Sequence, residues 1–126
     1  MIARVLVIDD DEYIRRALAR SLTHAGFEVT TATGSTPAME LTHLFDLVVC
    51  DYNLGSDANG ADVVRHFKAQ YAGHIYCAVL SGEDDPMTRN ECLAAGADDV
   101  FVKPASPREL KQRLLAAALE LRSVAA

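Results

Sequence analysis

Short apolar runs recur along the chain, and most of them stop at a polar residue. Continuous runs of this length, followed by turn residues, predict strands that are buried on both faces of a parallel sheet. The run at residues 27–32 alternates instead, which predicts an edge strand. The predicted strands are Arg4–Ile8, Phe27–Ala32, Leu47–Asp51, Ile75–Leu80 and Val100–Val102.

Between these runs, apolar residues fall at the three- and four-residue spacing of amphipathic helices. The helix ends carry further signals, namely a glycine after the last turn or a proline in the first position. Ser106 and Glu109 have the spacing of a capping box. The predicted helices are Glu12–Ala25, Pro37 to about Leu44, Ala61 to about Tyr71, Pro86 to Gly96, and about Pro107 to Ser123.

Five strands that alternate with five helices predict a doubly wound α/β fold, with a parallel sheet, helices on both faces and right-handed crossovers. The expected strand order is 2-1-3-4-5, as in flavodoxin-like folds. A chain of 126 residues has the length of one domain, and we expect residues 1–126 to form it. This order puts the first strand beside the third, so the residues that follow them share one crevice.

Composition narrows the class of protein. Half of the residues are hydrophobic, as in a globular chain, and the net charge of −6 argues against a dedicated nucleic-acid surface. We find no apolar run near the roughly 20 residues of a membrane helix and no secretory signal. Cys50, Cys77 and Cys92 are scattered, and we interpret them as small buried hydrophobes of a reduced, cytoplasmic protein.

The polar residues at the strand ends form a chemically coherent set, although each alone has an ordinary structural explanation. Asp9 and Asp10 follow the first strand, Asp51 ends the third, Ser81 follows the fourth and Lys103 the fifth. Carboxylates at close range favour a hard divalent cation such as Mg²⁺, which often completes its shell with a phosphate oxygen. A lysine and a hydroxyl suit the other phosphoryl oxygens. One carboxylate then remains as a nucleophile that forms an aspartyl phosphate.

The chain resembles the receiver domains of two-component response regulators over nearly its whole length. The motifs that carry the resemblance are Val7-Ile8-Asp9-Asp10, Val49-Cys50-Asp51, Ser81 after an apolar strand, and Val102-Lys103-Pro104. The resemblance implies a switch that takes a phosphoryl group from a histidine kinase or a histidine phosphotransfer protein and controls a downstream output domain or protein. It also implies self-catalysed phosphotransfer and autodephosphorylation, and no other enzyme activity.

The resemblance assigns roles to individual residues. It implies Asp51 as the phosphoacceptor; Asp9, Asp10, Asp51 and the backbone carbonyl of Asn53 as ligands of Mg²⁺; Ser81 and Lys103 as the residues that bind the phosphoryl group; and a cis peptide bond before Pro104.

Three features depart from the family pattern. Gly55 stands where a proline usually follows the phosphoacceptor, and the loop up to Gly60 is about one residue longer. The position in the fifth strand that often carries a switch tyrosine or phenylalanine is Val100. The neighbouring Phe101 should point to the opposite face of the sheet and stay in the core.

The resemblance implies that partners read the surface of the fourth helix, the fifth strand and the fifth helix, which is also a possible homodimer interface. The candidate exposed contacts are Arg89, Asn90, Arg108 and Lys111. Gly82 leaves room for a water beside the acyl phosphate, and Asn53 and Glu83 can orient that water. We therefore predict a short-lived phosphoryl state.

Other functions fit the residues less well. A phosphatase of the haloacid-dehalogenase type needs an acid two residues after the nucleophile, where this chain has Asn53. A flavin- or nucleotide-binding module needs a loop that cradles phosphate, and Asp9–Asp11 would repel it. A degenerate receiver would lack key residues that are present here. The chain ends soon after the last predicted helix, so it is either a stand-alone receiver or a piece of a longer protein.

Overall fold

The computed structural model describes residues 2–42, 44–55, 58–82 and 84–125, and within them five parallel strands form one sheet. The order β2-β1-β3-β4-β5 confirms the predicted topology. The predicted strand boundaries are right to within one residue. The strands are β1 (Arg4–Ile8), β2 (Glu28–Ala32), β3 (Leu47–Asp51), β4 (Tyr76–Ser81) and β5 (Asp99–Val102).

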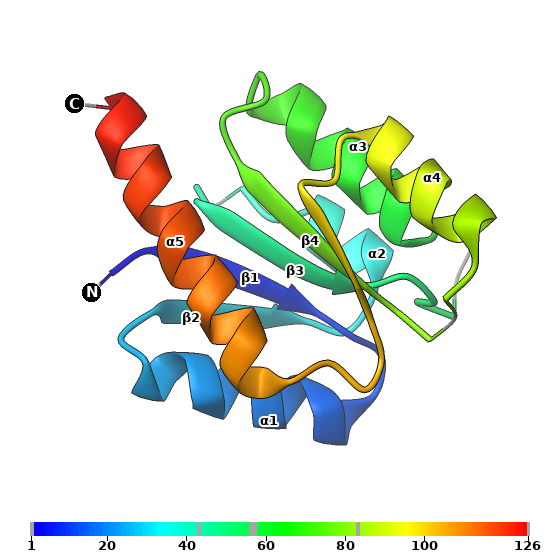
Figure 1. Ribbon diagram of the computed structural model, residues 1–126, viewed down its shortest axis with the longest axis horizontal. Coiled ribbons are helices and arrows are strands. Elements are labelled where there is room, and N and C mark those ends of the chain that lie inside the picture. The colour runs from blue at the N-terminus through cyan, green and yellow to red at the C-terminus, as the bar shows by residue number, and fades with distance from the viewer. Residues whose placement is uncertain (1, 43, 56–57, 83, 126) are drawn as a thin grey trace.

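Helices cover both faces of the sheet (Figure 1). On one face lie α1 (Glu12–His24) and α5 (Pro107–Ala125), and on the other lie α2 (Ser35–Met39), α3 (Gly60–Gln70) and α4 (Pro86–Ala95). Apart from α2, the predicted helix boundaries are right to within two residues. Among the described residues, no helix has the length and apolar character that crossing a membrane requires.

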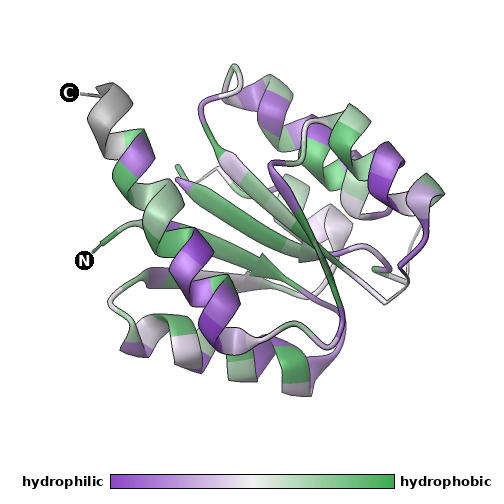
Figure 2. Ribbon diagram, in the orientation of Figure 1, coloured by the Kyte–Doolittle hydropathy of each residue, from purple (hydrophilic) through white to green (hydrophobic). Residues whose placement is uncertain are grey.

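Two hydrophobic cores lie on the two faces of the sheet, because successive strand residues point in opposite directions. In β3, Val48 packs under α2, α3 and α4, and Leu47 packs under α1 and α5. The central strands are therefore apolar on both faces, as their hydrophobic colouring in Figure 2 shows. Cys50, Cys77 and Cys92 are buried free thiols in the core under α2–α4, as their interpretation as small hydrophobes predicts.

Helix α2 departs most from the sequence-based prediction. The predicted start at Pro37 and end near Leu44 are both wrong, because the helix follows Gly34 as its N-cap and ends at Met39. Pro37 lies in the first turn, where a missing N–H breaks no intrahelical hydrogen bond, so proline marks that turn and not its first residue. Leu44 is 71% exposed and gives the helix no buried contact that would extend it.

Helix α3 begins one residue earlier than predicted, at Gly60, because of a capping box that the sequence analysis missed. The side chain of Asn59 accepts a hydrogen bond from the Asp62 N–H at 3.1 Å, and the Asp62 carboxylate accepts one from the Asn59 N–H at 2.9 Å. These two bonds satisfy N–H groups that the first turn leaves free. They also fix the point at which the loop after Asp51 enters the helix.

Candidate functional site

The strand register brings the predicted site residues to one edge of the sheet. Asp51 at the end of β3 pairs with Leu80, and Ser81 at the end of β4 pairs with Val102. Strand β1 ends level with β3 to within one residue. The residues found at this carboxyl edge are Asp9, Asp10, Asp51, Ser81 and Lys103.

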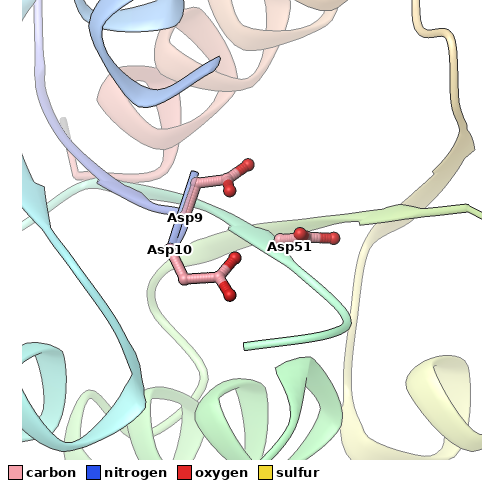
Figure 3. A group of neighbouring side chains, drawn as sticks. All are labelled: Asp9, Asp10 and Asp51. Carbon is pink, nitrogen blue, oxygen red and sulfur yellow. The ribbon is translucent and has the colours of Figure 1, made fainter. Parts of the chain in front are cut away.

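Three carboxylates meet at this edge. One oxygen from each of Asp9, Asp10 and Asp51 lies within 4.8 Å of the other two. Figure 3 shows the Asp9 and Asp10 side chains, from consecutive residues, extending to the side where Asp51 lies. Asp9 and Asp51 are buried and Asp10 is exposed, so the cluster reaches solvent at Asp10.

Asp9 tests whether the cluster fits a metal ion. Its Oδ1 accepts a hydrogen bond from the Asp11 N–H at 2.9 Å, but among the described residues no donor reaches its buried Oδ2. Burial raises the pKa of the Asp9 carboxyl; the Asp11 N–H opposes the rise, whereas the charges of Asp51 and Asp10 add to it. A buried, unpartnered oxygen beside two further carboxylates is the donor set that a hard divalent cation such as Mg²⁺ prefers. The residues therefore fit the ion.

Lys103 supplies a positive charge to the cluster. Its Nζ lies 3.0 Å from Asp51 Oδ2, and the Asp51 side chain is 8% exposed. The Lys103 N–H donates to the carbonyl of Ser81 at 2.7 Å, which ties the residue after β5 to the end of β4. Ser81 is itself buried, at 2% exposure. The peptide bond between Lys103 and Pro104 is cis, the form that the family resemblance implies.

Two glycines shape the loop between Asp51 and α3. Gly55 has a φ of +67°, which proline cannot adopt, and a Cβ there would lie 3.1 Å from Asp10 Oδ2. A proline therefore could not occupy position 55 in this backbone conformation. At Gly60 a Cβ would lie 2.9 Å from both the Asp51 carbonyl oxygen and Tyr52 Cα. The close approach of α3 to the acceptor residue thus requires glycine at position 60, which the sequence analysis did not recognise.

Tyr52 is a further residue near the site that the sequence analysis missed. Its phenol donates a short hydrogen bond to the Glu91 carboxylate on α4 and accepts one from Asn59 Nδ2 at 3.3 Å. The hydrogen bond to Glu91, together with partial burial, raises the pKa of Tyr52 to about 12. No local pattern predicts this contact, because Tyr52 and Glu91 are 39 positions apart.

The remaining predicted residues lie around the rim. Asn53 and Gly82 are exposed, and Glu83 lies outside the described residues. Apart from its two chain neighbours, a Cβ at Gly82 would meet no heavy atom of the described residues within 4 Å, so the described part of the chain leaves room for a side chain at position 82. Val100 packs into the core under α2–α4 and Phe101 into the opposite core, as their alternation along β5 predicts.

A doubly wound sheet with an acidic cluster and a lysine at its carboxyl edge defines the receiver class of signalling domain. Residues 5–115 match the response regulator receiver domain family, and the chain belongs to that family. This match confirms the resemblance stated from the motifs.

Individual relatives agree with the family. The chain is 33% identical over 117 residues to the uncharacterized transcriptional regulatory protein YrkP of Bacillus subtilis, covering 92% of this chain and 49% of YrkP. It is 37% identical over 115 residues to the transcriptional regulatory protein KdpE of Mycobacterium tuberculosis, covering 90% and 50%. A CheY-like receiver domain protein from Methanospirillum hungatei superimposes with a TM-score of 0.88 at 25% identity, covering 98% of each chain. The chain thus spans about half the length of these two curated relatives.

Proposed function

We propose that residues 1–126 form a phosphorylation switch in which Asp51 takes a phosphoryl group from a histidine kinase or a histidine phosphotransfer protein, in a Mg²⁺-dependent reaction in the cytoplasm. One observation carries the proposal: three carboxylates gather within 4.8 Å of one another beside the ammonium of Lys103, which forms an ion pair with Asp51. The negative charge of this cluster exceeds what Lys103 neutralises, which suits a divalent ion.

Asp51 is the nucleophile in this proposal. One of its carboxylate oxygens forms a bond to phosphorus while the bond between phosphorus and the donor's imidazole nitrogen breaks, and that nitrogen keeps the electron pair. Asp9, Asp10, Asp51 and the backbone carbonyl of Asn53 would hold Mg²⁺, whose charge offsets that of the phosphoryl oxygens. The buried position of Asp51 limits the contact of its carboxylate with bulk water. The domain catalyses its own phosphorylation and dephosphorylation and acts on no other substrate.

The phosphoryl group adds up to two negative charges and new acceptor oxygens at the sheet edge. In our proposal the Lys103 ammonium moves from the Asp51 carboxylate to a phosphoryl oxygen, and the Ser81 hydroxyl donates to another. Ser81 ends β4 and Lys103 follows β5. These two movements would shift the segments after both strands.

The α4–β5–α5 surface is the face that we expect partners to read. Arg89 on α4 donates to the carbonyl of Val100 at 3.4 Å, and Arg113 on α5 forms an ion pair with Asp99 at 2.9 Å, so each helix contacts β5 through an arginine. A change at β5 therefore reaches both helices. The expected partners are an output domain or protein, as in the longer transcriptional regulatory relatives, or a second copy of the chain, with no membrane or direct nucleic-acid binding by this domain.

Phosphodonor labelling tests the acceptor. The protein is incubated with acetyl phosphate and Mg²⁺, and intact mass spectrometry counts the phosphoryl groups on the chain. We expect one group on the wild type, none on Asp51→Asn because an amide is a poor nucleophile, and one on the control Asp84→Asn, which changes an exposed carboxylate outside the site. Full labelling of Asp51→Asn would refute the assignment.

A further inference from the structure

Tyr52 connects the acceptor residue to helix α4. It directly follows Asp51, and its backbone is held on both sides: its N–H donates to the carbonyl of Leu80 at 2.8 Å, and its own carbonyl accepts the Gly60 N–H at 2.9 Å. Its side chain leaves this fixed backbone and reaches the Glu91 carboxylate of α4. The link therefore starts one residue from the phosphoacceptor and ends in the middle of a helix on the surface that partners read.

Helix α4 has few buried residues. Only Cys92 and Ala95 of its ten residues are buried. It lies beside α3 on the same face of the sheet (Figure 1). The phenol of Tyr52 also accepts a hydrogen bond from Asn59, the N-cap of α3, so one oxygen joins the start of α3 to the middle of α4. Because only two side chains of α4 are buried, we expect this polar link to contribute to where the helix lies.

The side chain at position 100 cannot transmit a change at the site to the surrounding helices. Val100 is half-buried and has no polar group, so it can neither report a movement of the site by ring rotation nor donate a hydrogen bond. We propose that Tyr52 is the positioning residue that couples the state of Asp51 to helix α4, through the hydrogen bond from its phenol to Glu91. The inference rests on the proposed function, because Asp51 is the residue whose state changes. A displacement of the backbone at Asp51 and Tyr52 then moves α4 through Glu91.

The test uses beryllofluoride with Mg²⁺ as a non-covalent phosphoryl analogue on the 126-residue chain. Fluorine NMR measures how much analogue is bound, and backbone amide NMR measures the chemical-shift changes of α4. Tyr52→Phe keeps the ring but removes the donor, and Glu91→Ala removes the acceptor. Glu91→Gln keeps a side-chain oxygen and serves as the rescue variant. Tyr71→Phe is the matched control, because it removes a phenol that accepts a hydrogen bond from the Phe45 N–H, in the segment before β3.

We expect all these proteins to bind the analogue. The α4 shift changes should fall to less than half of the wild-type size in Tyr52→Phe and Glu91→Ala, and should remain in Glu91→Gln and Tyr71→Phe. Amide hydrogen exchange of α4 without the analogue should be faster in the first two variants.

Two results would overturn the inference and leave the proposed function intact. One is a wild-type α4 response in Tyr52→Phe with the analogue bound, even where α4 exchanges faster, because Tyr52 would then have a merely structural role. The other is an α4 response that is lost equally in Tyr71→Phe. If the wild type binds no analogue at all, the proposed function itself is wrong and the inference fails with it. The same holds if Asp51→Asn binds the analogue as well as the wild type does.

Discussion

Replacing Asp9 by asparagine should make the metal-free protein more stable. The side chain is 1% exposed, and one of its two oxygens has no hydrogen-bond donor among the described residues. Asparagine has the same shape and keeps the oxygen that accepts from the Asp11 N–H. Its Nδ2 would replace the unpartnered Oδ2 and would face the carboxylates of Asp10 and Asp51 as a donor. The substitution thus turns a repulsive contact into an attractive one.

The size of the effect follows from the geometry. A buried polar group without a partner costs about 1–3 kcal/mol. Two full charges 4.8 Å apart repel by about 3 kcal/mol at an effective dielectric constant near 20. Lys103 offsets part of this repulsion, and the bond to Asp11 loses about 1 kcal/mol when its acceptor becomes neutral. We therefore expect Asp9→Asn to raise the free energy of unfolding by about 2 kcal/mol, or Tm by roughly 6–10 °C.

Circular dichroism with urea or heat measures this stability with and without MgCl₂. A ligand at one hundred times its Kd adds about 2.7 kcal/mol to the wild type, and Asp9→Asn should lack most of that gain. The control Asp11→Asn makes the same chemical change at an exposed N-cap, where asparagine and aspartate are similar. Its stability should stay within about 1 kcal/mol of the wild type, with a full response to Mg²⁺.

The pH dependence has a definite sign. The pKa of Asp9 is raised in the folded state, so ionising Asp9 destabilises the metal-free fold as the pH rises through that pKa. The advantage of Asp9→Asn should be complete above the raised pKa of the folded state and should disappear below the ordinary aspartate pKa of 3.8, where both states of the wild type are neutral at this residue. An Asp9→Asn protein that is less stable than the wild type at pH 7 without metal would refute the electrostatic reasoning.

Three further predictions concern the rim of the site. Lys103→Ala should still accept a phosphoryl group on Asp51, but its β5 amides should not respond to bound beryllofluoride; a β5 response of wild-type size in NMR would exclude the role of the lysine. Gly82→Val should fold, because a Cβ there meets no described heavy atom within 4 Å apart from its chain neighbours. It should slow dephosphorylation by roughly 3–10-fold, about 1 kcal/mol of barrier, so an equal or faster decay at the same Mg²⁺ would reject the access argument. Glu91→Ala should lower the pKa of Tyr52 from about 12 toward 10, because the protonated phenol then loses its hydrogen-bond acceptor. NMR of the tyrosine rings measures this pKa, and an unchanged value would mean that burial and not Glu91 raises it.

Much of the fold and of the site could be predicted because both depend on local patterns. Continuous apolar runs mark strands buried on both faces, and the polar residue after each run marks the edge of the sheet at which a site forms. Parallel topology then brings Asp9, Asp51 and Lys103 together without any knowledge of the loops. The alternation of Val100 and Phe101 between the two cores follows from the same two-residue period.

The features that could not be predicted depend on contacts between distant residues or on backbone angles. The positive φ of Gly55 and the close approach at Gly60 arise from how the loop after β3 packs against the sheet edge. A glycine in the sequence signals only that such freedom is available. The hydrogen bond from Tyr52 to Glu91 requires α4 to lie against that loop. Neither residue has a local pattern that marks it as part of the site.

The arrangement gives the acceptor two connections to one surface. Lys103 binds Asp51 directly and follows β5, whereas Tyr52 follows Asp51 in the chain and binds α4. The first connection responds to charge, because the ammonium goes where the negative charge is greatest. The second responds to the position of the backbone. If both connections act, Tyr52→Phe alone should mainly reduce the response of α4, and Lys103→Ala alone should mainly reduce that of β5. The double variant Tyr52→Phe, Lys103→Ala should lose the α4 response entirely. An α4 response of wild-type size in the double variant would require a route to this surface that passes through neither residue.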